Sequence, residues 1–253
     1  MAILDKFRLD GKVAVVTGGS GGIGRGIALA FADAGADVAI ISRTKSAVDE
    51  TVEDLKKFGH RVLGISGDVN ERSTIPNALD QVVKEFGAID IMVNNAGSGE
   101  DAQYTWPMPP ENWDTQMAYN ARQKFWGSQE AALRMPDGGR IINISSRSAL
   151  HASPGFAAYA AANMAIISYS QTLAAELAPR GITVNCITPG VVFTNGIVKS
   201  LNSTPEDLQT NPRWAAPIGR VGQPSDIGAA ALFFASPAAE WTTGQCLTVA
   251  GGR

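Results

Sequence analysis

Short β-branched runs alternate with longer amphipathic segments along this chain, and each pair fits a strand followed by a helix. Residues 13–17, Val-Ala-Val-Val-Thr, predict a buried strand, and a helical pattern follows over about 22–34. Parallel strands need crossover helices, so the repetition predicts a parallel sheet covered on both faces. The further expected strands are 38–42, 61–66, 89–94, 140–145, 182–187 and 246–249, and the further expected helices are 45–58, 71–86, 113–134, 157–178 and 225–235, the last with Ser225 as its N-cap. We therefore predict one doubly wound α/β domain over residues 1–253, with about seven strands.

The composition excludes several classes of protein. The 21 Lys and Arg against 24 Asp and Glu give a net charge of −3, and no dense basic run is present, which argues against nucleic-acid binding. No apolar run approaches the roughly 18 residues that span a bilayer, and the N-terminus lacks an apolar signal core. Cys186 and Cys246 are too few for a disulfide framework or a zinc cluster. We expect a cytoplasmic protein with no membrane contact and no bound metal.

A glycine-rich turn, Thr17-Gly-Gly-Ser-Gly-Gly-Ile-Gly24, directly follows the first expected strand. Glycines permit a tight turn and a close approach of the backbone to a pyrophosphate. The helix that follows offers free N–H groups and the positive end of its dipole to that anion. A tight turn without a ligand is the alternative interpretation, but the strand before it and the helix after it favour a dinucleotide site.

The second expected strand ends in Ser42-Arg43, where an acid would bind the ribose 2′-hydroxyl of NAD. Arginine suits the extra 2′-phosphate of NADP, because its planar fork donates two hydrogen bonds. A solvated surface arginine is the alternative. We predict NADP(H) as the cofactor, with NAD(H) less favoured.

Two long segments, 98–110 and 191–217, interrupt the alternation of strands and helices. Ligands of open α/β sheets bind beyond the carboxyl ends of the strands, so we expect both loops over the site. Trp106 and Trp214 in these loops are candidates for contact with an apolar substrate, and packing within the core or between subunits is the alternative. His151 is a further candidate, although a lone loop histidine is more often exposed or packed.

In their order and spacing these motifs resemble the short-chain dehydrogenase/reductase family, over nearly the whole chain. Asn94-Asn95-Ala96-Gly97 is similar to the family's Asn-Asn-Ala-Gly motif, and Ser146 precedes Tyr159 by 13 residues, as the family's catalytic serine precedes its tyrosine. The resemblance implies a Rossmann-type fold, hydride transfer between a nicotinamide cofactor and a carbonyl or alcohol substrate, and a homotetramer.

The resemblance also implies individual roles. Asn120 would hold a water, Ser146 would hydrogen-bond the carbonyl oxygen, and Tyr159 would give it a proton. Position 163, four residues after Tyr159, is the fourth catalytic position. Together with the turn and Ser42-Arg43, the expected cofactor contacts are Gly18, Ser20, Gly22, Ile23, Gly24, Ser42, Arg43, Asp68, Val69, Asn95, Ala96, Gly97, Tyr159, Asn163, Pro189, Gly190, Val192 and Thr194.

Position 163 departs from the family pattern Tyr-x-x-x-Lys, because this chain has Tyr159-Ala-Ala-Ala-Asn163. Four residues along a helix place both side chains on one face, roughly 6 Å apart. The family's lysine holds the ribose hydroxyls and lowers the tyrosine pKa, whereas asparagine carries no charge. We expect the Tyr159 pKa to stay near its ordinary value of about 10.

The missing charge affects the two directions of reaction unequally. Reduction needs Tyr159 as an acid, whereas oxidation needs tyrosinate, which is about a thousandfold scarce at pH 7 when the pKa is near 10. We predict a reductase acting on a reactive, hydrophobic carbonyl compound. Lys124 and Arg147 are candidates for a substitute cation, but we expect Lys124 on a solvated helix face and Arg147 at a solvated strand end.

A second class of function stays open: a nucleotide-binding sensor or scaffold that kept the cofactor site and lost its chemistry. An engineered inactive variant with Asn163 in place of lysine would show the same sequence. Dehydratase or epimerase chemistry has no motif in its favour.

The Asn163→Lys substitution tests the argument about charge. It should raise alcohol oxidation near neutral pH more than it raises carbonyl reduction, because a nearby cation favours tyrosinate. Steady-state rates in both directions, followed by nicotinamide absorbance, measure this. Equal gains in both directions would contradict the argument.

Overall fold

The computed structural model describes residues 2–97, 102–200, 203–211 and 214–252. The described strands form one parallel sheet of seven in the order β3-β2-β1-β4-β5-β6-β7, which confirms the predicted α/β class. They are β1 (Val13–Thr17), β2 (Asp37–Ser42), β3 (Val62–Ser66), β4 (Ile91–Asn94), β5 (Arg140–Ile144), β6 (Thr183–Pro189) and β7 (Cys246–Val249).

Helices connect these strands and cover both faces of the sheet. The α-helices are α1 (Gly22–Asp33), α2 (Lys45–Lys56), α3 (Thr74–Phe86), α4 (Pro110–Gln116), α5 (Gln123–Arg134), α6 (Ala157–Leu177), α7 (Asn195–Ser200), α8 (Pro205–Thr210) and α9 (Pro224–Ala235). Short 3-10 segments are η1 (Ile3–Phe7), η3 (Arg147–Ala149), η4 (Ala178–Arg180) and η5 (Pro237–Ala239), and η2 (Met117–Arg122) is a π-helical turn that joins α4 to α5.

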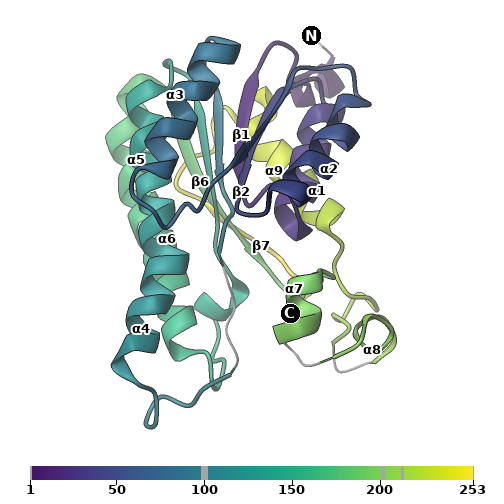
Figure 1. Cartoon of the computed structure of the whole chain (residues 1–253), viewed down its shortest axis with the longest axis vertical. Helices are drawn as coiled ribbons and strands as arrows, with labels where there is room; N and C mark the ends of the chain where they lie inside the picture. Colours follow the sequence, from purple (N-terminus) through teal and green to yellow (C-terminus); the bar gives the residue numbers. More distant parts are fainter. Residues whose placement is uncertain (1, 98–101, 201–202, 212–213, 253) are drawn as a thin grey trace.

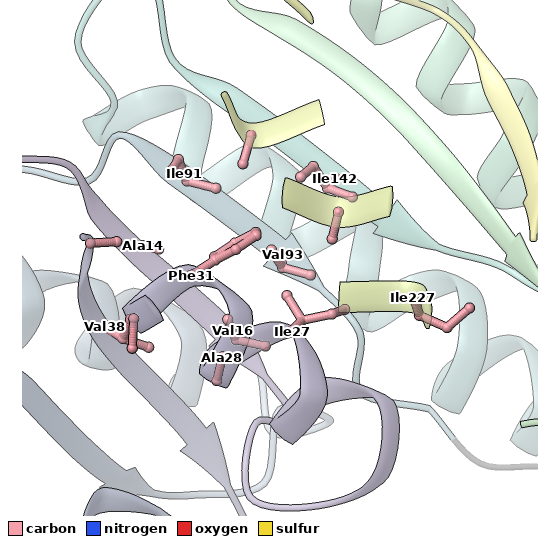
Figure 2. Close-up of a cluster of buried hydrophobic side chains, with 14 of the residues drawn as sticks. Ala14, Val16, Ile27, Ala28, Phe31, Val38, Ile91, Val93, Ile142 and Ile227 are labelled. Carbon is pink, nitrogen blue, oxygen red and sulfur yellow. The ribbon is translucent and has the colours of Figure 1, made fainter. Parts of the chain in front are cut away.

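The alternation of side chains along each strand builds two cores. Ala14 and Val16 of β1 face the layer of α1, α2 and α9, where Phe31 is fully buried (Figure 2). Val13 and Val15 face the layer of α3, α5 and α6. The two helix layers lie on opposite sides of the sheet in Figure 1. Burial on both faces explains why the strands are near-continuous runs of apolar residues.

The strand order reverses between β1 and β4, which is the switch point where an open α/β sheet forms its crevice. Thr17, the last residue of β1, connects the ends of β1 and β4 at this point. Its Oγ1 accepts hydrogen bonds from the backbone N–H groups of Asn95 at 3.0 Å and Ala96 at 3.1 Å, directly after β4. Beyond this end of the sheet lie α4 on one side and α7 and α8 on the other (Figure 1).

The segment 191–217, predicted as a loop, contains two short helices, so that prediction is wrong in part. Side-chain caps explain them: Thr194 Oγ1 accepts from Ile197 N at 3.1 Å, and Thr204 Oγ1 accepts from Asp207 N at 3.0 Å. Residues 98–101, 201–202 and 212–213 of the two expected loops lie outside the described residues.

The predicted cap of the last helix is also wrong. The helix α9 begins at Pro224, with Gln223 as N-cap and Ser225 inside the first turn. Proline suits the first helical position because its missing N–H would be unpaired there. The Asp226 carboxylate accepts a hydrogen bond from Gln223 N at 2.7 Å, which satisfies the end that Ser225 was expected to cap.

Candidate active site

The glycine-rich turn between β1 and α1 is shaped to receive an anion. Gly18 takes a left-handed φ of +65° and donates its N–H to Ile41 O, which folds the turn back onto β2. At Gly19 a Cβ would lie 2.6 Å from Ile40, whereas at Gly21 a Cβ would meet no atom within 4 Å. Gly21 is the N-cap of α1 and provides no side-chain cap. The N-terminus of α1 therefore has no side-chain cap and has open space beside Gly21, as a pyrophosphate site requires.

The end of β2 lies beside this turn. Ser42 Oγ accepts a hydrogen bond from Ser20 N at 3.1 Å, so these two expected cofactor residues are in contact. Arg43 is exposed, and within the described chain its guanidinium makes no ion pair. An arginine without a carboxylate partner, next to the N-terminus of α1, fits a phosphate group.

Asp68 and Val69 follow β3. The Asp68 carboxylate accepts from Asn70 N at 3.0 Å and from Asn70 Nδ2 at 2.9 Å, and Val69 is buried in the core. Asp68 thus stabilises its own turn, and its contact with a cofactor stays a prediction.

The segment after β6 closes over the glycine-rich turn. Gly190 N donates to Val249 O at 3.0 Å, and Val192 forms a bridge with Gly222. A Cβ at Gly22 would lie 3.0 Å from Thr194 Cγ2, so Thr194 lies against the start of α1. The structure therefore brings Pro189–Thr194 and the turn, far apart in sequence, to one end of the sheet.

Ser146, Tyr159 and Asn163 meet beyond the end of β5. Ser146 follows β5 closely, and Tyr159 and Asn163 lie one turn apart on α6. Burial raises the pKa of Tyr159, and hydrogen bonding with the Ser146 and Asn163 side chains opposes that shift. The Tyr159 ring lies edge-to-face with Phe156, with centroids 6.4 Å apart. A tyrosine with a raised pKa is protonated at neutral pH.

Asn163 is fully buried and holds this part of α6 in place. Its Nδ2 donates to Tyr159 O at 2.9 Å, and its backbone O accepts from Ser145 Oγ at 2.8 Å. Its Oδ1 is buried and has no partner in the described structure. An unpaired buried acceptor is costly, so it marks a place where a donor from a ligand or water fits.

Asn120 lies in the π-helical turn η2, a feature found frequently at functional sites. Its side chain is buried, and its Nδ2 donates to Gln116 Oε1 at 2.9 Å. A Cβ added at Gly97, after β4, would lie 2.8 Å from Asn120 Oδ1. Asn120 therefore borders the same strand ends as the residues above.

Lys124 is the residue that sequence reasoning misplaced. We expected it on a solvated helix face, and this is wrong: it is 3 % exposed. Its Nζ donates to Ile144 O, the last residue of β5, at 2.6 Å. Burial lowers its pKa to about 7. The signal in the sequence was its spacing of four from Asn120, which places both on one helix face.

Of the expected substrate residues, the structure brings two together. Trp106 and His151 line a cavity of about 580 Å³, together with Ala157, Ala160 and Met164 of α6. Tyr159 is not among the described residues that line this cavity. Tyr159 lines a separate cavity of about 20 Å³ with Met108 and Phe156. Trp214 lies near α8, where its Nε1 donates to Asp207 Oδ2 at 3.1 Å.

Known proteins define the family. A family model described as enoyl-(acyl carrier protein) reductase matches residues 18–253. Versicolorin reductase of Emericella nidulans is 33 % identical, covering 100 % of this chain and 99 % of its own. The solved structure of a 7α-hydroxysteroid dehydrogenase complexed with NADH and 7-oxo glycochenodeoxycholic acid has a TM-score of 0.91 at 36 % identity, covering 100 % and 98 % of the two chains. That of a short-chain dehydrogenase from Burkholderia cenocepacia with NADP has a TM-score of 0.88 at 36 % identity, covering 97 % and 98 %.

The chain therefore belongs to the short-chain dehydrogenase/reductase family of oxidoreductases, which confirms the resemblance. In the described part of the chain, no helix is both long enough and apolar enough to cross a membrane.

The pKa of Lys124 predicts how stability depends on pH. Its pKa of about 7 in the folded chain lies below the ordinary value of about 10.4 expected on unfolding. Between these values the unfolded chain binds a proton that the folded chain does not, so stability rises with pH. Relative to Lys124→Met, the free energy of unfolding of the original chain should rise by on the order of 2 kcal/mol from pH 7 to pH 9. Urea denaturation of both proteins measures this, and parallel pH profiles would contradict burial of Lys124.

Proposed function

We propose that this chain is an NADP(H)-dependent reductase that transfers hydride between the nicotinamide and a ketone, aldehyde or secondary alcohol, favouring reduction of a hydrophobic carbonyl. The observation that carries the proposal is the pair of Ser146 and Tyr159 beyond β5, with the Tyr159 pKa raised by burial. A tyrosine that keeps its proton at neutral pH is an acid ready to donate it.

In this mechanism Ser146 Oγ donates a hydrogen bond to the carbonyl oxygen of the substrate and fixes its position. Tyr159 Oη gives its proton to that oxygen as negative charge develops there. The cofactor, when bound, supplies the hydride. Burial raises the pKa of Tyr159, so tyrosinate is scarce at neutral pH and the oxidation of alcohols is the slower direction.

Arg43 supports NADP(H) over NAD(H). Arg43 is exposed and follows Ser42, which contacts Ser20 of the glycine-rich turn, and its guanidinium offers the fork that a 2′-phosphate accepts. Related solved structures contain either cofactor, NADH in one and NADP in the other. The choice for this chain therefore rests on Arg43 and on the absence of an acid at the end of β2.

Apolar side chains support a hydrophobic substrate. Met108 and Phe156 line the small cavity beside Tyr159, which Gln103, Asn112 and Gln116 also border. A relative with 36 % identity binds 7-oxo glycochenodeoxycholic acid, and another is named for the reduction of versicolorin. A polycyclic ketone with a large apolar body is therefore the substrate class to test first. Trp106, His151 and Trp214 stay candidate substrate contacts.

A homotetramer is part of the proposal. Phe125 and Leu133 on α5 and Met164 on α6 are 48 %, 76 % and 41 % exposed, and exposed apolar side chains on neighbouring helices favour contact with a second copy. A cytoplasmic location stays a prediction that rests on the two free cysteines.

Replacement of Tyr159 by phenylalanine tests the function. It should lower kcat/KM for NADPH-dependent reduction of a polycyclic ketone at least ~100-fold, because the proton donor is lost. The Kd for NADPH, from fluorescence titration, should change little. The matched control is Tyr169→Phe, also on α6, which should stay near the original rate. If the original chain binds NADPH but reduces none of a panel of carbonyl compounds, the sensor interpretation replaces this one.

Replacement of Arg43 by alanine tests the cofactor. Losing charge-assisted hydrogen bonds to the 2′-phosphate should raise the KM for NADPH on the order of 10- to 100-fold. The KM for NADH should stay within about threefold, because NADH lacks that phosphate. Lys45→Ala, two residues along, is the control. Equal effects of Arg43→Ala on both cofactors would contradict the assignment.

A further inference from the structure

Lys124 is a buried cation without a counter-charge. Of the residues that the structure describes, no carboxylate pairs with its Nζ, which donates to Ile144 O at 2.6 Å. An ammonium group carries three donors, and burying it unpaired is costly. An aliphatic side chain would fill this position at lower cost, so packing does not explain a lysine here.

The position of this ammonium group is at the site, not in the distant core. Ile144 ends β5, and Ser145 and Ser146 follow it. A Cβ added at Gly97, after β4, would lie 3.3 Å from Lys124 Nζ and 2.8 Å from Asn120 Oδ1. Lys124 Nζ therefore lies between the carboxyl ends of β4 and β5, where the expected cofactor and substrate groups meet.

Asn163 supplies the complementary half of the arrangement. Its backbone O accepts from Ser145 Oγ at 2.8 Å, so α6 is bonded to Ser145. Lys124 on α5 is bonded to the preceding residue, Ile144. Its Oδ1 is buried and unpartnered, whereas Lys124 Nζ has donors to spare. A hydroxyl group or water between them would accept from Lys124 and donate to Asn163, which satisfies both.

We propose that Lys124 supplies the positive charge of this site from α5, and that Lys124 Nζ and Asn163 Oδ1 together bind a water that returns a proton to Tyr159. The inference rests on the reductase function proposed above. Lys124 is a positioning residue in this scheme, because it acts through Tyr159. After Tyr159 gives its proton away, the ammonium charge stabilises the phenolate. The bridging water then gives a proton to Tyr159 and takes one from Lys124, and Lys124 regains a proton from solvent before the next turnover.

The surroundings allow Lys124 to exchange protons near neutral pH. The titratable group that acts on Lys124 is Cys186 on β6, whose pKa burial raises to about 12. Tyr159 and Tyr169 lie on α6, which packs against α5, and burial raises their pKa values as well. These three groups stay protonated at pH 6–9, so a transition near pH 7 belongs to Lys124, whose pKa is lowered to about 7.

The test uses the full chain with four changes: Lys124→Met, Asn163→Lys, both together, and Lys84→Met as an exposed control on α3. Lys124→Met should lower kcat for NADPH-dependent reduction at least ~10-fold and remove the inflection near pH 7 from its pH profile. In the Lys124→Met background, Asn163→Lys should restore kcat for reduction to within about threefold of the original chain. The factor by which Asn163→Lys raises kcat should be larger in that background than in the original chain. Lys84→Met should change neither quantity.

Two results would overturn the proposal. In the first, Lys124→Met has the same kcat and pH profile as Lys84→Met. In the second, Asn163→Lys changes kcat by the same factor in the original chain and in the Lys124→Met background. Thermal melts show whether Lys124→Met folds. If it does not fold, Lys124→Gln, which keeps a donor without the charge, takes its place in the same comparison. If the original chain reduces no carbonyl compound, the proposed function fails. The Kd for NADPH of the Lys124→Met and Lys84→Met variants then tests the charge assignment by itself. A Kd at least ~10-fold weaker in Lys124→Met than in Lys84→Met supports the charge assignment, and equal values refute it.

Discussion

The contact between Thr17 and the backbone after β4 is the constraint on which the rest of the site depends. The strand order reverses at this point, so two neighbouring loops leave the sheet in opposite directions. Thr17 Oγ1 accepts from Asn95 N and Ala96 N, and Asn95 Nδ2 donates to Thr17 O at 2.9 Å. These bonds fix the glycine-rich turn relative to Gly97, and through it relative to Asn120 and Lys124.

A second set of polar contacts continues from the site into the interior. Asn94 Nδ2 donates to Asn143 Oδ1 at 2.9 Å and to Ser128 Oγ at 3.0 Å, and Asn143 Nδ2 donates to Ser170 Oγ at 2.9 Å. They join β4, β5, α5 and α6, the elements that carry or directly precede the candidate catalytic residues. Buried polar groups favour one arrangement of their partners, because any other leaves donors unpaired. Lys124 lies one turn before Ser128 on the same face of α5 and extends this set to the strand ends.

Much of the fold followed from local pattern. The runs at β1 and β2, the glycine turn and the alternation of strands and helices predict a doubly wound sheet, because side-chain periodicity and turn chemistry are local. The wrong predictions about the fold concern helix starts, which are set by individual capping hydrogen bonds. Gln223 and Asp226, rather than Ser225, begin α9, and Thr194 and Thr204 start helices inside an expected loop. The motif residues around the turn, β4, β5 and α6 do meet at one end of the sheet, whereas Trp106 and His151 line a cavity separate from that of Tyr159.

The sequence by itself determined the class of fold, the place of the glycine-rich turn and the absence of a charge at Asn163, because each is written in adjacent or periodic residues. Only the tertiary structure decided what surrounds position 163. The burial of Lys124, its bond to Ile144 O and the unpaired Oδ1 of Asn163 arise from contacts between α5, β5 and α6, which are distant in sequence. A charge is exposed or buried according to what packs on it, and the spacing of Lys124 from Asn120 shows a shared helix face but not that β5 covers it. The departure from the spacing Tyr-x-x-x-Lys therefore reveals the missing cation, whereas the buried one is visible only in the folded chain.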